Sequence, residues 1–251
     1  MSRPGRETLL VIAHRGSSGT APENTMAAFQ RAVAAGVDLI ELDTRLTKDG
    51  VLAVLHDRTL NRTTDGKGRI RSMTTAALAM VDAGSWYGQP FRGERVPLLK
   101  DVLTAIPPHV GINIEVKTDG DVRKALFEDR LLSLLERSGK GRKIIVSSFD
   151  HRFLGRLHHK APGMVTGALH RAIVDGSRKP SAISRRLGTR AFICSLGQLR
   201  KRSVRDAHDH GIIVAVYGVN TLRHLARAQR FDVDAIVTDY PELIIRALRK
   251  G

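Results

Sequence analysis

Residues 38–57 read Asp-Leu-Ile-Glu-Leu-Asp-Thr-Arg-Leu-Thr-Lys-Asp-Gly-Val-Leu-Ala-Val-Leu-His-Asp, and the rest of the chain is organised around this stretch. Their first half is an apolar run that is broken by two carboxylates, Glu41 and Asp43. Side chains of a β-strand alternate between its two faces, so these carboxylates point the same way. Like charges on one face of a buried strand repel each other and lose hydration. The pattern therefore predicts a cation or a basic partner beside this strand.

The second half of this stretch predicts a hairpin. Lys48-Asp49-Gly50 is typical of a turn, and a second apolar run, 51–55, ends at His56. An ordinary hairpin with a polar tip is the alternative. That alternative does not explain why acidic residues interrupt the first apolar run.

The chain as a whole alternates between short apolar strands and helical segments. Strands are expected at residues 8–13, 37–44, 112–117, 143–148, 164–169, 191–195, 212–217 and 235–238. Helices are expected at residues 25–36, 97–106, 122–136, 151–159, 181–187, 201–210, 221–229 and 241–248. Either Asn24 or Thr25 can cap the first of these helices, and Gly36 ends it.

Eight strands that alternate with helices in one chain of 251 residues are typical of a TIM (β/α)8 barrel. An open doubly wound sheet is the alternative, but no Gly-x-Gly-x-x-Gly follows the first strand. Residues 57–97 interrupt the alternation and contain one short helical piece, 75–81. Such a segment is too long for a simple connection, so we expect a small inserted cap between the hairpin and the next helix. The predicted organisation is one catalytic domain, 1–251, with this insertion inside it.

Composition restricts the class of protein. Hydrophobic residues make up 42% of the chain, yet no run of 18 apolar residues occurs and no secretory leader precedes the first strand. We therefore expect a cytoplasmic protein without a membrane span. The single cysteine, Cys194, excludes an internal disulfide framework and a cysteine metal cluster. These features are compatible with either a monomer or a homo-oligomer.

The charge is unevenly distributed. The formal net charge is +16, and residues 151–251 hold 19 Lys and Arg against 7 Asp and Glu. A basic surface of this kind attracts polyanions. Aromatic residues are only 4% of the chain, so platforms for base stacking are scarce and we expect no dedicated nucleic acid partner. A weakly active barrel that binds polyanions through its basic C-terminal half stays open as an alternative.

Polar residues stand where the predicted strands end. His14 follows the first strand, Glu41 and Asp43 close the second, and Glu115 and Lys117 close the third. In a barrel these positions converge at the C-terminal mouth, where TIM-barrel active sites lie. Carboxylates without cysteine favour a hard divalent cation, Mg²⁺ or Ca²⁺, with Mn²⁺ as a further option.

Two histidines and two cations complete this set. His14 and His56 suit acid–base chemistry near neutral pH. Arg15 and Lys117 would neutralise a phosphate. Neighbours two apart on a strand rarely pair closely, so we expect Lys117 at the phosphate rather than in an ion pair with Glu115. A metal with these groups points to phosphoryl transfer or phosphodiester cleavage.

Several motifs closely resemble those of the glycerophosphodiester phosphodiesterase family, in its bacterial cytosolic branch. They span essentially the whole chain, in order and with family-like spacing: His14-Arg15-Gly16, Ala21-Pro22-Glu23-Asn24-Thr25, Glu41-Leu42-Asp43, Leu55-His56-Asp57, Asp82-Ala83-Gly84-Ser85-Trp86, Pro97-Leu98-Leu99, Glu115-Val116-Lys117, Ser147-Ser148-Phe149 and Val219-Asn220. The chain departs from the family near the seventh strand, where Gly218 follows Tyr217 in place of threonine.

The resemblance implies a TIM barrel with a small inserted domain and a role for each matching residue. It implies a divalent metal on Glu41, Asp43 and Glu115, an acid–base pair formed by His14 and His56, and substrate contacts from Arg15, Lys117 and Tyr217. The expected partner is a small glycerophosphodiester.

The implied reaction cleaves glycerophosphodiesters to sn-glycerol 3-phosphate and an alcohol, a step of lipid and glycerol metabolism. Within it we assign His14 as the base and His56 as the acid. A lysophospholipase D-type hydrolase is the alternative within the enzyme class, and it would require an apolar groove for an acyl chain.

Overall fold

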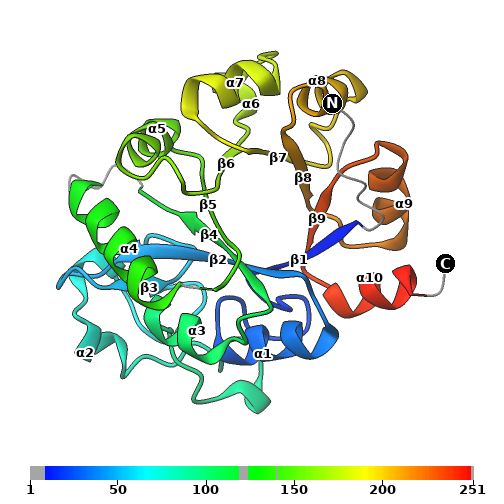
Figure 1. Cartoon of the computed structure of the whole chain (residues 1–251). Coiled ribbons are helices and arrows are strands. Elements are labelled where there is room, and N and C mark those ends of the chain that lie inside the picture. Colours follow the sequence, from blue (N-terminus) through cyan, green and yellow to red (C-terminus); the bar gives the residue numbers. More distant parts are fainter. Residues whose placement is uncertain (1–8, 119–123, 140, 250–251) are drawn as a thin grey trace.

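The computed structural model describes residues 9–118, 124–139 and 141–249, and within them eight parallel strands close into a barrel (Figure 1). In chain order they are β1 Leu10–His14, β2 Leu39–Leu46, β4 Gly111–Val116, β5 Ile144–Ser148, β6 Thr166–Leu169, β7 Ala191–Ser195, β8 Ile213–Tyr217 and β9 Ala235–Thr238. Strand β1 closes the barrel because it pairs on both sides, Ile12 lying opposite Leu39 of β2 and Val237 of β9. The predicted TIM barrel is confirmed, and the open doubly wound sheet is wrong.

Helices surround the barrel on its outside (Figure 1). They are α1 Met26–Ala35, α3 Leu99–Ala105, α4 Lys124–Ser138, α5 His151–Lys160, α6 Ala172–Asp175, α7 Pro180–Leu187, α8 Lys201–Asp209, α9 Leu222–Arg230 and α10 Pro241–Leu248. Most bounds lie within two residues of those predicted. The short helix α6 was not expected from the sequence. The predicted starts at Thr8 and Val122 lie outside the described residues.

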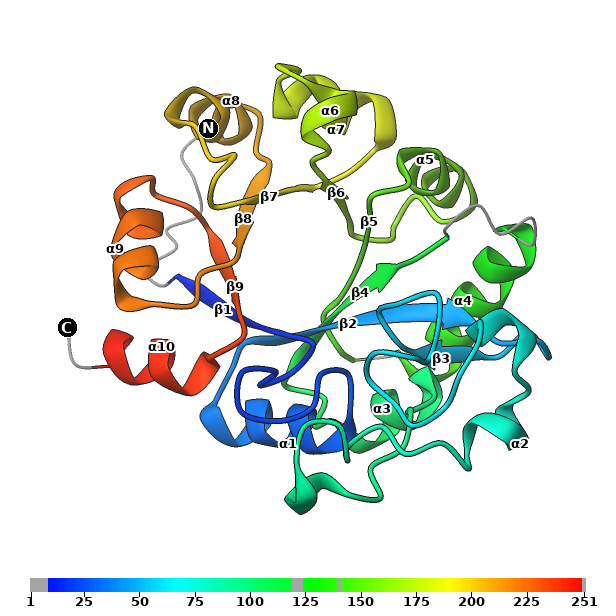
Figure 2. The ribbon, with the colours of Figure 1, turned by 180° about the vertical axis from the view of Figure 1, so that it is seen from behind.

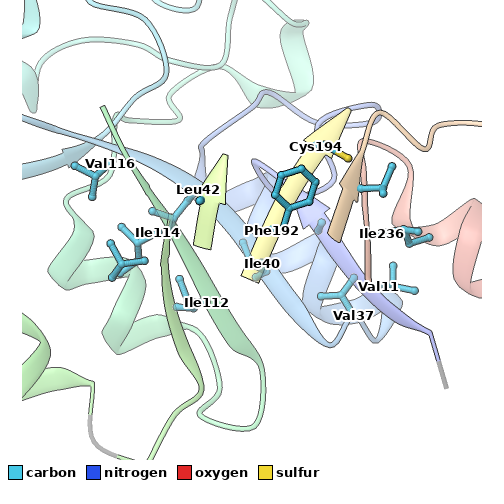
Figure 3. Packing of buried hydrophobic residues seen from close by; sticks show 14 of the residues in the cluster. Val11, Val37, Ile40, Leu42, Ile112, Ile114, Val116, Phe192, Cys194 and Ile236 are labelled. Carbon is cyan, nitrogen blue, oxygen red and sulfur yellow. The ribbon is translucent and has the colours of Figure 1, made fainter. Parts of the chain in front are cut away.

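The main core fills the space between the strands and the helices. Alternate strand residues such as Val11, Ile40 and Leu42 point outward into it, together with Ile112 and Ile114 (Figure 3). The residues between them, Ile12 and Leu39 among others, form a second cluster inside the barrel. Because both faces of the strands are buried, their sequences are nearly continuous apolar runs. Carboxylates within such strands are therefore exceptions that need an explanation.

The first helix also shows which of its two candidate residues is the cap. The Thr25 side chain accepts a hydrogen bond from the Ala28 amide at 3.3 Å, and Gly36 ends the helix at a φ of 85°. Asn24 does not cap this helix. It adopts a φ of 59°, and its side chain instead donates to Asp43 at 2.9 Å. The cap and the site thus use adjacent residues.

The segment between β2 and α3 lies beside the barrel (Figure 2). It consists of β3 Leu52–Val54, antiparallel to β2, then η1 Ile70–Ser72, α2 Thr75–Leu78 and η2 Gln89–Phe91. The predicted helix 75–81 ends earlier, at Leu78, and both Leu78 and Val81 contribute to a separate apolar cluster in this segment. No helix in the part of the chain that the structure describes is both long enough and apolar enough to cross a membrane.

Candidate active site

Neighbouring strands bring the predicted carboxylates together. Glu41 and Asp43 come from β2, and Glu115 of β4 lies opposite Asp43 in the strand register. One oxygen of each lies within 4.8 Å of the others, and all three residues are buried. Burial and the nearby charge of Asp43 raise the pKa of Glu41 to about 8. Burial would also raise the pKa of Asp43, but Lys117 and Arg15 outweigh it and lower that pKa to about 2.

Lys117 pairs with this cluster. Its Nζ lies 3.1 Å from Asp43 Oδ1 and donates a hydrogen bond to Glu115 Oε1. The expectation that Lys117 would not pair with Glu115 is wrong. The long lysine side chain folds back over its own strand, and one ammonium group reaches both carboxylates because they lie opposite each other on neighbouring strands. The ring of Phe149 lies 5.8 Å from the same Nζ.

Arg15 contacts the cluster from the other side. Its backbone amide donates to Glu41 Oε2 at 2.9 Å, and its Nε lies 3.2 Å from Asp43 Oδ2. This backbone position has a φ of 54°, and Gly16 follows with a φ of 80°. A Cβ on Gly16 would lie 2.6 Å from the Ala28 carbonyl carbon, so the turn after β1 needs glycine there.

His14 is held by a partner that sequence reasoning missed. Its Nδ1 donates to Asp239 Oδ1 at 2.6 Å, and its Nε2 lies 4.0 Å from Glu41 Oε2. Asn220 orients Asp239 in turn, since its side chain accepts from the Asp239 amide at 2.9 Å and donates to Asp239 Oδ2. Burial lowers the pKa of His14, but the Asp239 hydrogen bond and the Glu41 charge together raise it above its ordinary value.

One signal could have found Asp239. It directly follows the last strand, β9, and is thus a polar residue at a strand end like His14 or Lys117. Asn220, by contrast, already belonged to one of the quoted motifs.

His56 follows β3 and has a similar support. Its Nδ1 donates to Asp57 Oδ1 at 2.7 Å. Arg62 binds the other oxygen of Asp57 at 2.8 Å and also both oxygens of Glu23 at 2.8 Å. Glu23 accepts from Arg15 as well, at 2.8 Å, so an ionic network links the supports of the two halves of the site. Burial lowers the pKa of His56.

Tyr217 lies at the end of β8, and β8 pairs with β7 so that Tyr217 stands opposite Ser195. The side chain is partly buried, and this burial raises the pKa of its phenol. All of the predicted site residues thus lie at one end of the barrel, although the lysine is ion-paired rather than unpaired.

A large cavity lies at the other end of the barrel. Its volume is about 850 Å³, and its walls include the first residues of several strands, such as Leu10, Leu39 and Ile144. Glu41, Asp43 and Glu115 do not line it. This cavity is therefore not an acyl-chain groove that continues from the carboxylates.

The fold and this arrangement define a class of protein. Buried carboxylates, two cations and two supported histidines at the C-terminal end of a TIM barrel are typical of a hydrolase that acts on phosphate esters. The model of the glycerophosphoryl diester phosphodiesterase family matches residues 14–243, and the chain belongs to this family of phosphoric diester hydrolases.

Relatives support this assignment over nearly the full length of the chain. A glycerophosphodiester phosphodiesterase of Caldanaerobacter subterraneus is 36% identical over 243 residues, which cover 96% of this chain and 98% of that one. A glycerophosphodiester phosphodiesterase of Bacillus subtilis is 31% identical, and the match covers 98% of this chain and 88% of that one. The structure of an Oleispira antarctica phosphodiesterase in complex with its product sn-glycerol-3-phosphate superimposes with a TM-score of 0.89, at 29% identity, and covers 96% of this chain and 97% of that one.

Proposed function

We propose that this chain hydrolyses glycerophosphodiesters to sn-glycerol 3-phosphate and an alcohol, with a divalent metal ion and with His14 and His56 as the acid–base pair. The observation that carries the proposal is the buried set of Glu41, Asp43 and Glu115 beside two supported histidines. The product bound to the similar Oleispira antarctica phosphodiesterase supports the substrate class.

The donor set fits a metal ion. The three side chains offer only oxygen ligands, which Mg²⁺, Ca²⁺ and Mn²⁺ prefer. Glu41 Oε1 is buried and has no hydrogen-bond partner among the described residues. Burial and the charge of Asp43 raise the pKa of Glu41 to about 8, so an added cation would stabilise its ionised form. A divalent cation held by Glu41, Asp43 and Glu115 would supply a Lewis acid that neutralises charge on the phosphoryl oxygens.

The chain's own cations would hold the phosphate. The guanidinium of Arg15 and the ammonium of Lys117 flank the carboxylates, 3.2 Å and 3.1 Å from Asp43. A phosphodiester placed over the cluster would meet both positive charges, which favour the extra negative charge that develops during cleavage. Tyr217 at the end of β8 would contact the rest of the substrate.

The two histidines would move the protons. In each ring Nδ1 is bound to a carboxylate, Asp239 or Asp57, so Nε2 is the nitrogen that is left for the substrate. We assign His14 as the base because it lies beside Glu41, and His56 as the acid because it lies on the hairpin side, where the alcohol would depart. The raised pKa of His14 favours a proton donor, and the lowered pKa of His56 favours a proton acceptor, which is the opposite order. Substrates with different leaving groups distinguish the two orders.

The experiment that tests the reaction is product identification. The purified chain, supplied with Mg²⁺ or Ca²⁺, is incubated with glycerophosphocholine, and sn-glycerol 3-phosphate is measured with glycerol-3-phosphate dehydrogenase. We expect stoichiometric release of sn-glycerol 3-phosphate and choline. Release of phosphocholine instead, or turnover of lysophosphatidylcholine alone, would contradict the proposal.

A further inference from the structure

A second group of positive charges lies beside the carboxylates. Among the residues that the structure describes, five basic side chains line a small cavity of about 80 Å³, and no acidic residue lines it. The basic residues are Arg45, Arg58, Arg69, Arg71 and Lys117. Leu46, Ile70, Thr118 and Phe127 form the rest of the wall. We call this cavity the arginine pocket.

The arginine pocket adjoins the candidate active site at two residues. Lys117 lines the pocket and also contacts Asp43 and Glu115. Arg45, on β2, donates from Nε to the backbone carbonyl of His56 at 2.8 Å. A group bound by Arg45 and Lys117 would therefore lie near the backbone of His56, on the side proposed above for the departing alcohol.

The fold does not require arginine at the rim of this pocket. In η1, Ile70 is the buried residue and belongs to the apolar cluster of the insertion. Arg69 and Arg71 on either side of it are exposed. Arg69 pairs with Thr59 through an isolated backbone bridge, which any side chain would permit. Packing thus accounts for Ile70 but leaves its two charged neighbours without a structural reason.

Asp43 and Glu115 balance the charge of Lys117, and the four arginines of the pocket add further positive charge beside it. Cations gathered around one small volume repel one another, and an anion between them removes that repulsion. The planar guanidinium group binds the oxygens of a carboxylate or a phosphate in a bidentate way. Among these, a phosphate monoester carries the larger charge and more acceptor oxygens, so it suits a pocket with several arginines better.

We propose that the arginine pocket binds a second phosphate group, carried as a monoester on the alcohol part of the substrate. The preferred substrates are then glycerophosphodiesters whose alcohol is itself phosphorylated. This inference rests on the proposed function. The size agrees with it, because a cavity of about 80 Å³ holds one compact anion and not a whole headgroup, a single water taking about 30 Å³ in the liquid.

The test compares two substrates that differ by one phosphate: glycerophosphoinositol and glycerophosphoinositol 4-phosphate. Both would release sn-glycerol 3-phosphate, so one assay measures kcat/KM for each. We expect the wild type to prefer the phosphorylated diester by roughly tenfold or more, from charge-assisted hydrogen bonds to the arginines. The variant Arg69→Ala/Arg71→Ala should bring the two values of kcat/KM to within about twofold of each other by raising KM for the phosphorylated diester.

A matched control distinguishes phosphate binding in the arginine pocket from attraction of the substrate by the overall positive charge of the protein. Arg227 and Arg230 are both exposed in the last turn of α9, so Arg227→Ala/Arg230→Ala removes the same charge elsewhere. This control should keep the full preference. The inference is overturned if the wild type cleaves both diesters equally well, if Arg69→Ala/Arg71→Ala keeps the preference, or if the control loses it to the same extent. If neither inositol diester is cleaved while glycerophosphocholine still yields sn-glycerol 3-phosphate, the inference is also overturned; if glycerophosphocholine is not cleaved either, the proposed function itself fails.

Discussion

His14 and Asp239 lie 225 residues apart in the chain, yet His14 Nδ1 and Asp239 Oδ1 lie 2.6 Å apart. The contact exists because β1 and β9 are neighbours in the closed barrel. It gives His14 a fixed ring orientation, with Nε2 facing the side of Glu41.

Asp239→Asn tests this orientation. An asparagine can still accept a hydrogen bond, but it removes the charge that favours the imidazolium form of His14. We expect kcat for glycerophosphocholine to fall by about 10²-fold, within the range for general acid–base groups, while KM changes little. Steady-state kinetics at saturating metal, together with an unchanged circular dichroism spectrum, would check it. A kcat within about twofold of wild type would mean that Asp239 only fills space.

The variant Glu41→Gln tests, through its melting temperature, whether the buried charge of Glu41 destabilises the protein without a metal. The folded pKa of Glu41, about 8, lies above its usual value near 4.5, so in chelator the wild type should lose stability as pH rises from about 4.5 to about 8. The glutamine variant lacks this titration. In EDTA at pH 8 it should therefore melt several degrees above the wild type, while it needs more Mg²⁺ or Ca²⁺ for activity.

Melting curves with and without metal measure the first effect, and metal titrations of activity measure the second. Full wild-type activity in excess chelator would contradict the metal site. A lower melting temperature for Glu41→Gln in EDTA would show that the buried charge of Glu41 does not destabilise the folded protein.

Substrates with different leaving groups show which of the two histidines is the acid and which is the base. An acid is needed only when the departing oxygen is a poor leaving group, and its help is worth roughly 10²–10⁴-fold. His56→Ala should cripple cleavage of glycerophosphocholine yet largely spare a glycerophospho-nitrophenol diester. His14→Ala should damage both. The opposite pattern would exchange the roles, in the direction that the raised pKa of His14 and the lowered pKa of His56 favour.

Variants of Lys117 show whether its ammonium group contacts the phosphate or only pairs with the carboxylates. If its ammonium binds the phosphate, Lys117→Ala should reduce kcat/KM on the order of 10²-fold, as for loss of one transition-state charge contact. Lys117→Arg should restore little, because a larger planar fork replaces a compact charge between Asp43 and Glu115. A kcat/KM within about threefold of wild type for Lys117→Ala would instead leave Lys117 as a partner of the carboxylates alone.

Local pattern was enough to predict much of this protein. The alternation of strands and helices predicted the barrel, and period-two alternation placed Glu41 and Asp43 on one face of β2. The rule that barrel sites lie at strand ends then brought His14 and Glu115 to the same place. These features depend on residues a few positions apart and on one fold-level rule.

Only the tertiary structure decided which groups bind one another. The pairing of His14 with Asp239 requires β1 and β9 to be adjacent, and the link from Arg62 to Glu23 joins the insertion to the loop after β1. Lys117 pairs with Asp43 because β2 and β4 are neighbours in this register. A sequence determines which face a side chain occupies through backbone periodicity, which is local. It determines hydrogen-bond partners only through the closure and register of the barrel, because these bring distant residues to within hydrogen-bonding distance.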